Sequence, residues 1–479
     1  MSIALSIIYL IATITFVIGL KLLGHPETAK KGNLISSFGM GLAIVGTLFL
    51  QEKVLESGEI IPLYKAVPTF VYLLIIAAIL IGGIIGYFIA MKVEMTKMPE
   101  LVSLFNGFGG GSALLIGLIE FSKNVGIDPA LKVSNSILTT ILAAIIIGSI
   151  TFTGSLVAWA KLNGSMKDIR LPKYNLINNL LFLALVAFGA YIVIQNNDSL
   201  ILIYILLIAS LVYGFLFVVP IGGADMPVVI SLLNSLTGIA AAITGIIYSN
   251  MVMLVGGILV GSAGLILTFA MCKAMNRSLS NVIFGAFGGS SVAAGESGSK
   301  VGGTIKKTSA SDAAVLMNYS SNVVIVPGYG LAVAQAQHVI HELEELLTKK
   351  GVNVKYAIHP VAGRMPGHMN VLLAESNVDY SKLVEMDDIN PHFPNTDVVL
   401  VVGANDVVNP AAHNDPSSPI YGMPILDVEN AKHIIVNKRS MKPGYAGIEN
   451  ELFYNQKTSM LFGDAKDALT QLVNELKNM

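Results

Sequence analysis

Nine apolar stretches constrain this chain more than any other feature of its sequence. An α-helix needs about 20 apolar residues to cross the hydrocarbon core of a bilayer. Charged residues make up only 13% of the chain and hydrophobic residues 53%, whereas soluble domains contain about 25% charged residues. The sequence therefore predicts a polytopic α-helical membrane domain, with transmembrane helices near residues 2–23, 34–50, 68–91, 101–120, 134–160, 177–195, 199–219, 227–248 and 251–272.

Basic residues are distributed unequally between the two sides of these helices. Eleven lysines and arginines fall on the side where the ninth helix ends, and four fall on the opposite side. Because loops rich in Lys and Arg remain in the cytoplasm, we expect the N-terminus outside and the C-terminal region in the cytoplasm. The first stretch has neither the basic start nor the cleavage site of a signal peptide, so we expect a retained helix.

The last third of the chain has a different composition. Residues 321–479 carry 18 acidic residues, 12 basic residues and seven of the eight histidines. The charge density indicates a separate soluble domain, and its negative net charge argues against a nucleic-acid partner. Apolar runs such as "NVVIVP", "VKYAIHP", "DVVLVVGAND" and "HIIVNKRS" alternate with helix-like stretches at 331–350 and 464–477. This alternation predicts an open parallel α/β sheet.

A stretch rich in glycine and serine, "GAFGGSSVAAGESGSKVGG", lies between the two regions. Such a composition is typical of a flexible tether. We therefore predict a transmembrane domain at 1–277, a flexible linker at 278–320 and an α/β domain at 321–479.

The segment "VVIVPGYGLAVAQAQHVI", residues 323–340, combines a strand, a glycine turn and a helix. Gly328 and Gly330 would let the backbone approach a pyrophosphate, but Val333 replaces the third glycine of the dinucleotide-binding pattern. A glycine turn between any strand and helix would look similar, so the loop alone leaves both explanations open. "NGFGGGSALLIG", residues 106–117, has the same spacing inside a predicted membrane helix, where the glycines favour close helix packing.

A basic group follows a later strand, in "VNKRSMKPGYAG". NAD sites usually carry an acidic residue at the end of the second strand, but here that strand ends "YAIHP". Lys438, Arg439 and Ser440 suit a phosphate by charge and hydrogen bonding, which favours NADP(H) over NAD(H). The alternative is a solvated basic strand end.

Polar residues near other strand ends are further candidates. Arg364 lies in a Gly- and Pro-rich turn before a helix, where it could contact a pyrophosphate. Asn405 and Asp406 follow a strand at the sheet edge where ligands of open α/β sheets bind, although Asp406 could merely cap the following turn. No catalytic triad and no metal-ligand cluster stands out in the sequence, so we predict no metal site.

Four polar residues of the membrane half are candidates for a proton path or for coupling. Asn106 and Asn234 fall inside predicted helices, where each could join helices or hold water. Asp225 could cap its helix or couple the two halves of the chain at the cytoplasmic face. Glu94, at the same face, could take part in coupling or could simply be a solvated loop charge.

Several stretches together resemble the β subunit of proton-translocating NAD(P) transhydrogenase. They run in family order through nearly the whole chain: "KVEMTKMPEL", "TFTGSLVA", "IGGADMPVV", "MCKAMNRS", "PGYGLAVAQAQ", "IHPVAGRMPGHMNVLLAE", "VVGANDVVNPAA", "KRSMKPGYAGIEN" and "MLFGDAK". The combination is far more specific than the glycine loop alone.

The resemblance implies a Re/Si-specific transhydrogenase of a bacterial inner membrane, with a Rossmann-like NADP(H)-binding domain. Hydride would pass directly between NADP(H) on this chain and NAD(H) on a partner alpha subunit, while protons cross the membrane. It also implies a dimer of alpha–beta units embedded in lipid.

Carried over by motif, the resemblance implies an NADP(H) site in five segments. Gly328, Tyr329, Gly330, Ala332 and Val333 would form the first nucleotide loop. Gly363 and Arg364 would reach the pyrophosphate, and Asn405 and Asp406 the nicotinamide. The 2′-phosphate and the lid-like loop beside it would involve Lys438, Arg439, Ser440, Gly444, Tyr445 and Ala446.

The chain departs from the family pattern at Asn106, where some members carry a membrane histidine that relays protons. No predicted membrane helix of this chain contains a histidine, which argues against a simple histidine relay. A channel or transporter gated by a cytoplasmic nucleotide-sensing domain is the alternative function. That alternative predicts a selectivity filter or an interrupted helix pair. The sequence shows no filter in its membrane half.

Overall fold

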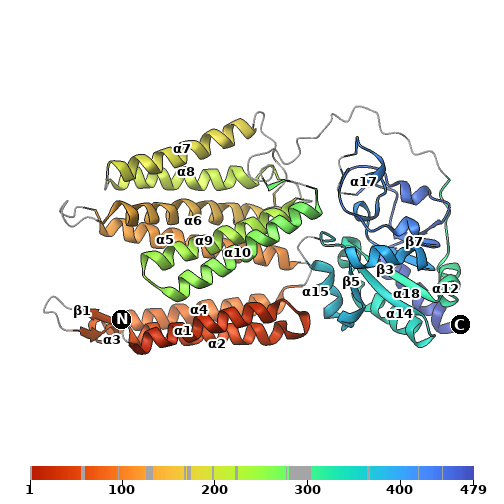
Figure 1. Ribbon diagram of the computed structural model, residues 1–479, viewed down its shortest axis with the longest axis horizontal. Coiled ribbons are helices and arrows are strands. Elements are labelled where there is room, and N and C mark those ends of the chain that lie inside the picture. The colour runs from red at the N-terminus through yellow and green to blue at the C-terminus, as the bar shows by residue number, and fades with distance from the viewer. Residues whose placement is uncertain are drawn as a thin grey trace. The chain divides into compact units, whose positions relative to one another are not determined.

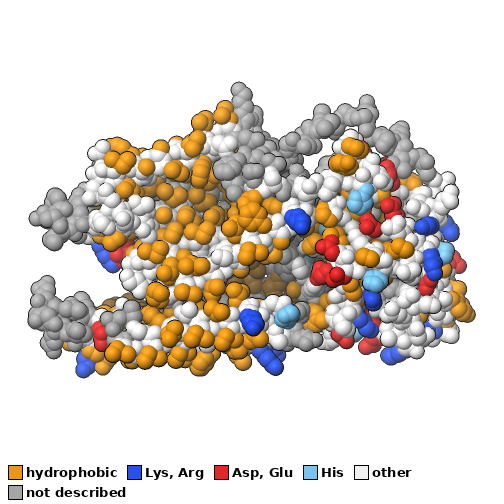
Figure 2. All heavy atoms as spheres, in the orientation of Figure 1, with side chains coloured by type: hydrophobic (Ala, Val, Ile, Leu, Met, Phe, Trp, Pro, Cys, Tyr) orange, Lys and Arg blue, Asp and Glu red, His pale blue; other side chains and the backbone are white. Residues whose placement is uncertain are grey.

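The computed structural model describes residues 3–54, 60–94, 97–125, 133–166, 169, 174–196, 199–221, 225–276, 278–279, 304–363, 367–418, 420–444 and 446–479. These residues form two compact units, one with most of the long helices and one with the sheet. Hydrophobic side chains cover the visible face of the long helices, whereas charged side chains gather over the sheet domain (Figure 2).

The predicted membrane helices are confirmed (Figure 1). Within the described residues, nine helices are long and apolar enough to cross a membrane: α1 (Ile3–Leu23), α2 (Pro26–Leu50), α4 (Thr69–Lys92), α5 (Met98–Lys123), α6 (Asn135–Leu162), α7 (Tyr174–Ile194), α8 (Leu200–Val218), α9 (Met226–Ile247) and α10 (Met251–Ala274). The chain is therefore a multi-pass membrane protein. Between α2 and α4 lie a short hairpin and one helical turn: β1 (Glu52–Val54), β2 (Ile60–Pro62) and α3 (Leu63–Ala66).

The second helix starts earlier than its apolar stretch. We expected it at residue 34, but α2 begins at Pro26, and Lys30 and Lys31 lie in its first turns. Proline is favourable at the first helical position because its missing N–H would have no partner there. Lysines near a helix end can extend their charged groups towards the membrane surface, so hydropathy alone underestimates the helix length.

Small residues bring the membrane helices into close contact. A Cβ on Gly110 of α5 would lie 2.8 Å from Thr151 Cβ of α6, and one on Gly148 of α6 would lie 2.7 Å from the backbone nitrogen of Leu114. On α9, Ser235 donates a hydrogen bond of 2.7 Å to the carbonyl of Gly261 on α10. Glycine and serine thus let these backbones approach where larger residues would separate them.

In its described residues, the C-terminal unit has six parallel strands. They are β3 (Asn322–Pro327), β4 (Asn353–Ile358), β5 (Leu383–Glu385), β6 (Val398–Val402), β7 (His433–Lys438) and β8 (Thr458–Phe462). Their order is β5-β4-β3-β6-β7-β8, so the direction of winding reverses between β3 and β6. This is a Rossmann-like doubly wound sheet, in which ligands bind at that reversal, beyond the carboxyl ends of the strands.

Both faces of the sheet are buried. Val323 and Ile325 of β3 pack in the cluster that includes residues of α14 (Gln337–Lys349), α15 (His368–Glu375) and α18 (Ala465–Asn478). Val324 and Val326 pack in a second cluster on the other face. This second cluster includes residues of five short helical segments: α16 (Met386–Ile389), η4 (Asn390–Asn395), η5 (Asp406–Val408), η6 (Val428–Asn430) and η7 (Glu451–Tyr454). Two further short segments of the domain are η3 (Tyr380–Lys382) and α17 (Ala411–Asn414).

The predicted linker at 278–320 is wrong for its last part. Residues 304–320 belong to the folded domain: the backbone nitrogen of Met460 in β8 donates to the carbonyl of Lys306 at 2.7 Å, and helix α12 (Ala310–Asn318) follows. Ala313, Ala314 and Met317 are buried in the cluster that also contains α18 residues. The sequence composition did not reveal this folded segment, because α12 is short and its apolar residues are mostly small. Residues 280–303 of the predicted linker lie outside the described part of the chain.

The helix predicted at 331–350 is two helices. The chain forms α13 (Tyr329–Val333), turns through Gln335 at a φ of 49°, and then forms α14. Ala336, between the two helices, is fully buried. The apolar pattern continues across the break because both pieces face the same core, so periodicity could not reveal it.

Candidate functional site

The candidate nucleotide site lies where the loops after β3 and β6 meet. The backbone nitrogen of Gly328 donates to the carbonyl of Val402 at 2.8 Å, and that of Gly330 donates to the carbonyl of Gly403 at 2.9 Å. These bonds hold the two loops together beyond the carboxyl ends of their strands, at the reversal of the sheet.

The glycines of the first loop are required by this contact. A Cβ on Gly328 would lie 2.4 Å from the Gly403 carbonyl oxygen, and one on Gly330 would lie 2.6 Å from Gly403 Cα. Gly403 itself has a φ of +68°, which favours glycine. The sequence motif suggested room for a pyrophosphate, and the structure adds that these glycines join two loops. Further along, Ala332 is buried and Val333 is exposed.

The loop after β4 packs near the first loop. Gly363 has a φ of +113°, and a Cβ there would lie 2.4 Å from Nδ1 of His368. The His368 ring is buried, and its centroid lies 6.2 Å from that of Tyr329. Gly363 and Tyr329, which we predicted at separate points of the site, are thus connected through His368. Arg364 lies outside the described residues.

Sequence reasoning missed His359, which fastens the loop after β4 to the segment beyond β6. Its Nδ1 accepts a hydrogen bond from the backbone nitrogen of Val361 at 3.2 Å, so its Nε2–H donates to the Pro424 carbonyl at 2.9 Å. Burial lowers the pKa of His359 to about 4, partly opposed by the bond to Pro424. The side chain is therefore neutral at pH 7. The motif "HP" at a strand end was its only sign in the sequence.

Asn405 and Asp406 lie against the predicted lid-like loop. Oδ2 of Asp406 accepts a hydrogen bond of 3.0 Å from the backbone nitrogen of Ala446. A Cβ on Gly444 would lie 2.6 Å from Oδ1 of Asp406 and 2.7 Å from Nδ2 of Asn405. Gly444 and Ala446 are thus brought together with Asn405 and Asp406. Tyr445 lies outside the described residues.

A second residue missed by the sequence, Asn450, fixes the far end of this loop. Its Nδ2 donates to the backbone carbonyl of Asn405 at 3.0 Å and to Oδ1 of Asn405 at 3.1 Å. Its own Oδ1 accepts from the backbone nitrogen of Leu452 at 3.0 Å. Within the described residues, Nδ2 of Asn405 is buried and has no hydrogen-bond partner. It therefore remains available as a donor.

Lys438 carries the most unusual charge of the site. Its Nζ is buried, lies 4.6 Å from the centroid of the Phe453 ring and has no hydrogen-bond partner in the described part of the chain. Burial lowers the pKa of Lys438, while the negative charge of Asp406 partly offsets the effect. Arg439 and Ser440, which follow it, are exposed. An incompletely paired cation beside two exposed phosphate-binding side chains is suited to an anion.

The four membrane candidates differ in their burial and in their contacts. Asn106 of α5 is buried; its backbone carbonyl accepts a 3.3 Å hydrogen bond from Oγ1 of Thr237 on α9, and its Nδ2 has no partner among the described residues. Asn234 lies on α9 one turn before Thr237 and is half-buried. Asp225 is buried and directly precedes α9. Glu94 is exposed and forms a 3.3 Å ion pair with Lys97.

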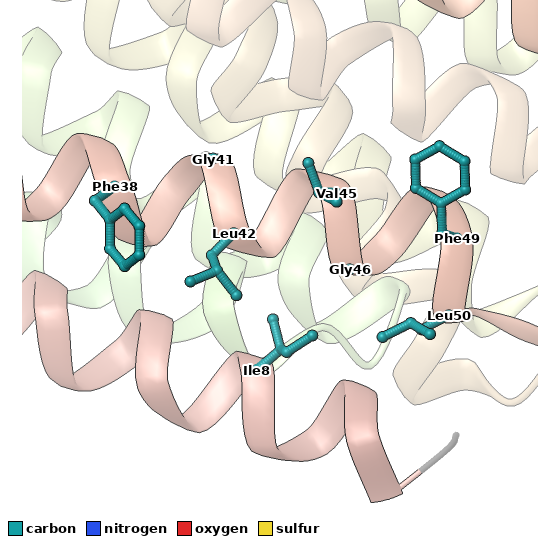
Figure 3. A pocket seen from close by; sticks show the side chains of 8 residues that line it. All are labelled: Ile8, Phe38, Gly41, Leu42, Val45, Gly46, Phe49 and Leu50. Carbon is teal, nitrogen blue, oxygen red and sulfur yellow. The ribbon is translucent and has the colours of Figure 1, made fainter.

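An apolar groove on the membrane helices is unsuited to a nucleotide. It has a volume of about 520 Å³ and lies between α1 and α2 (Figure 3). Its lining contains no polar side chain: Ile8, Phe38, Gly41, Leu42, Val45, Gly46, Phe49 and Leu50. Such a lining is compatible with hydrocarbon chains but supplies no partner for phosphate or ribose.

Comparison with known sequences shows the family of this chain. The sequence profile of the NAD(P) transhydrogenase beta subunit family matches residues 5–475. Two curated Rhodospirillum rubrum sequences named NAD(P) transhydrogenase subunit beta are each 46% identical to this chain over 472 residues, which cover 98% of both sequences. The chain, which has nine helices able to span a membrane and a parallel sheet within its described residues, is matched over nearly its whole length and therefore belongs to the NAD(P) transhydrogenase beta subunit family.

Proposed function

We propose that the sheet domain binds NADP(H), and that this chain works with an alpha subunit that holds NAD(H). Hydride would pass directly between the two cofactors, with Re/Si specificity, while protons cross the membrane through this chain. The buried ammonium of Lys438, without a hydrogen-bond partner among the described residues, supports the NADP(H) assignment most directly. The 2′-phosphate distinguishes NADP(H) from NAD(H), and it would neutralise that charge.

The other residues of the site fit the same cofactor. Arg439 and Ser440 are exposed next to Lys438 and would hold the 2′-phosphate with it. Gly363, Arg364 and the first loop would lie beside the pyrophosphate, at the reversal of the sheet. NADP(H) supplies or accepts the hydride when bound, so the protein needs to provide orientation and exclusion of water rather than an acid or base.

Asn405 would orient the nicotinamide end. Its Nδ2 has no partner among the described residues and can donate to a carboxamide oxygen. Asp406 holds the loop containing Gly444, Tyr445 and Ala446 through the Ala446 nitrogen. This loop would cover the cofactor and keep water away from it.

Proton movement would follow the contact between α5 and α9. Asn106 is buried there, and its Nδ2 could hold water, as could the amide of half-buried Asn234. Asp225, at the start of α9, would couple proton movement to the affinity of the domain for NADP(H). The proposed topology places the N-terminus outside a bacterial inner membrane and residues 304–479 in the cytoplasm, with alpha–beta units pairing as dimers. We retain residues 1–277 as the membrane domain.

A nucleotide-gated channel or transporter is not favoured. That function would need a selectivity filter or broken membrane helices near the midplane. Over the described residues, each candidate span is one continuous helix.

The NADP(H) assignment can be tested with Lys438→Met. We expect NADPH to bind about 10- to 100-fold more weakly, because hydrogen bonds to charged groups contribute about 1.5–3 kcal/mol, while the weak binding of NADH should not change. Fluorescence titration of the full chain in detergent measures both. Lys432→Met is the matched control: Lys432 immediately precedes the same strand at its opposite end and pairs with Asp397 at 2.8 Å. Equal losses for NADPH and NADH would contradict the assignment.

The same lysine predicts a pH dependence. Because burial lowers the pKa of Lys438, the ammonium loses its proton at a lower pH than an ordinary lysine. We therefore expect NADPH affinity to fall as the pH rises through this lowered value, with no matching loss for NADH. Lys438→Arg should abolish the alkaline loss, because arginine remains charged.

Coupling can be tested in vesicles that contain this chain and an alpha subunit. NADH-driven reduction of an NADP analogue and the internal pH are followed together. We expect Asp225→Asn and Asn106→Leu to slow proton movement, because the first removes an ionisable carboxylate and the second removes a polar amide from the proposed path. Asn178→Leu on α7 changes an equally buried amide and serves as the control. Normal pumping in both variants would exclude the path proposed here.

A further inference from the structure

Glu120 is an ionisable residue in the last turn of membrane helix α5. Its side chain is only 17% exposed, and its Oε1 lies 2.5 Å from Nζ of Lys123. A carboxylate in the last turn is unfavourable for the helix, because the C-terminal end of a helix carries partial negative charge. Ionisable residues within membrane helices are also costly and tend to be functional. The ion pair with Lys123 offsets part of this cost, but the helix dipole does not favour a carboxylate at this position.

Tyr248, immediately after α9, connects this carboxylate to a second helix. Burial raises the pKa of Tyr248 to about 12, and its hydrogen bond with Glu120 contributes to the increase. The phenol is therefore protonated at neutral pH and can donate to the Glu120 carboxylate. The result is a carboxylate held between a lysine of its own helix and a tyrosine of the neighbouring helix.

The Glu120–Tyr248 contact and the Asn106–Thr237 contact lie along the same pair of helices. A Cβ on Gly109 would lie 2.6 Å from Cγ2 of Thr237, so α5 and α9 also touch at mid-helix. Eleven positions separate Gly109 from Glu120, and eleven separate Thr237 from Tyr248. Two helices running in the same direction therefore remain in contact for about 16 Å, at about 1.5 Å per residue. We name this contact the α5–α9 seam.

We propose that Glu120 exchanges protons between the outer aqueous phase and the α5–α9 seam. This inference rests on the proposed proton translocation and on the proposed topology, which places the ends of α5 and α9 outside. The Glu120 carboxylate takes a proton from outer water and becomes a carboxylic acid. It then releases that proton to water in the seam, towards Nδ2 of Asn106, which has no hydrogen-bond partner among the described residues, and becomes a carboxylate again. The opposite direction of transport reverses these steps.

The charges around Glu120 suit this exchange. Two ionisable groups that face it are Lys123 and Tyr248. Helix α6 also packs on α5, where Gly117 approaches Ile145, but the only ionisable side chain of α6 is Lys161 near its other end. Lys123 balances the carboxylate and can turn to water when Glu120 is protonated. Tyr248 holds the charged form in place.

Glu120→Gln tests the inference, because it keeps the shape and removes the titration. The full chain is placed in vesicles with an alpha subunit, and pumping and hydride transfer are measured at several outer pH values. We expect both rates to fall on the order of tenfold or more and their response to outer pH to disappear, while NADPH binding in detergent is retained. Glu52→Gln, another outer carboxylate, should behave as wild type.

Two further variants separate proton exchange from a structural role. Glu120→Asp keeps the carboxylate and should restore part of the rate, and Tyr248→Phe should cause a smaller loss than Glu120→Gln. Wild-type pumping and an unchanged response to outer pH in Glu120→Gln would overturn the inference, as would an equal loss in Glu120→Asp. If the wild-type pair itself transfers hydride without moving protons, the proposed function fails rather than the role of Glu120.

Discussion

Two glycine segments with the same spacing serve different surroundings in this protein. In α5, Gly110 lets the backbone of one membrane helix approach another, with Gly148 of α6 on the facing side. In the sheet domain, Gly328 and Gly330 let one loop lie directly on the loop that contains Gly403. In both segments, two backbones can meet because glycine has no side chain.

The two contacts differ in which atoms would have to move to make room for a new side chain. In the membrane, the nearest atom to a new Cβ on Gly110 belongs to the side chain of Thr151, although backbone atoms lie only slightly farther away. In the sheet domain, the atoms nearest Gly328 are all backbone atoms of Gly403 and Ala404, whose loop is joined to β6. The same motif should therefore tolerate substitution better in the membrane than beside the nucleotide site.

Gly328→Ala is the strongest test of this comparison. We expect a loss of at least about 3 kcal/mol in the stability of the sheet domain and loss of NADPH binding, because the two loops must separate. Thermal unfolding and NADPH titration of the full chain measure both effects. Gly367→Ala is the control, since its φ of +66° is strained but its Cβ meets open space, so that only about 1–2 kcal/mol should be lost. Normal NADPH binding by Gly328→Ala would refute the loop contact.

The stability of the sheet domain should also fall in acid, whereas the glycine contact in the membrane has no such dependence on pH. Because the pKa of His359 in the folded protein is about 4, below its ordinary 6.5, the unfolded chain takes up a proton first as the pH falls. Stability is therefore full above pH 6.5 and declines by about 3 kcal/mol between pH 6.5 and pH 4. Hydrogen exchange of β4 measures this decline. His359→Gln should flatten it, and an unchanged profile in that variant would exclude His359 as its cause.

Gly110→Ala tests the membrane half of the comparison. The new Cβ would lie 2.8 Å from Thr151 Cβ and 2.9 Å from the Gly148 carbonyl oxygen, so we expect a loss of about 1–3 kcal/mol with NADPH binding retained. Thermal unfolding in detergent measures it. Gly83→Ala on α4 has no atom within 4 Å of its Cβ and should change little. A loss as large as that of Gly328→Ala would show that the two contacts are equally rigid.

The smallest effect is expected at Glu94. Both side chains of its ion pair with Lys97 are exposed to solvent. Glu94→Gln should therefore lower the stability of the protein by less than about 0.5 kcal/mol and leave pumping unchanged. Proton pumping by this variant is measured in vesicles that contain the chain and an alpha subunit. A clear loss of pumping would make Glu94 part of the coupling machinery and would extend the functional region beyond the α5–α9 seam.

Local patterns predicted the elements better than their contacts. The apolar stretches correctly indicated the nine membrane helices of the described residues, and the alternation of short apolar runs indicated the parallel sheet. The predictions failed where neither the composition nor the apolar pattern marks a change in structure. Residues 304–320 resembled a tether, although α12 is packed on the domain, and the break at Gln335 lay inside a continuous apolar pattern.

Side-chain partners far apart in sequence could not be predicted. His359 bonds to the carbonyl of Pro424, and Asn450 bonds to Asn405 across 45 positions. Neither partner belongs to a local motif, because each contact arises only when the strand order brings separate loops to one edge of the sheet. Lys438 was predicted as a phosphate ligand, but its burial beside Asp406 and Phe453 was not.

The sequence by itself determined that this chain spans a membrane, carries a parallel nucleotide-type sheet and resembles a transhydrogenase beta subunit. These properties follow from hydrophobicity, periodicity and short motifs, which act over a few neighbouring residues. The tertiary structure alone decided that Gly328 meets Gly403, that Lys438 is left with a buried charge and that Glu120 faces Tyr248. Packing decides such pairs, because it joins residues whose separation in sequence says nothing about their distance in space.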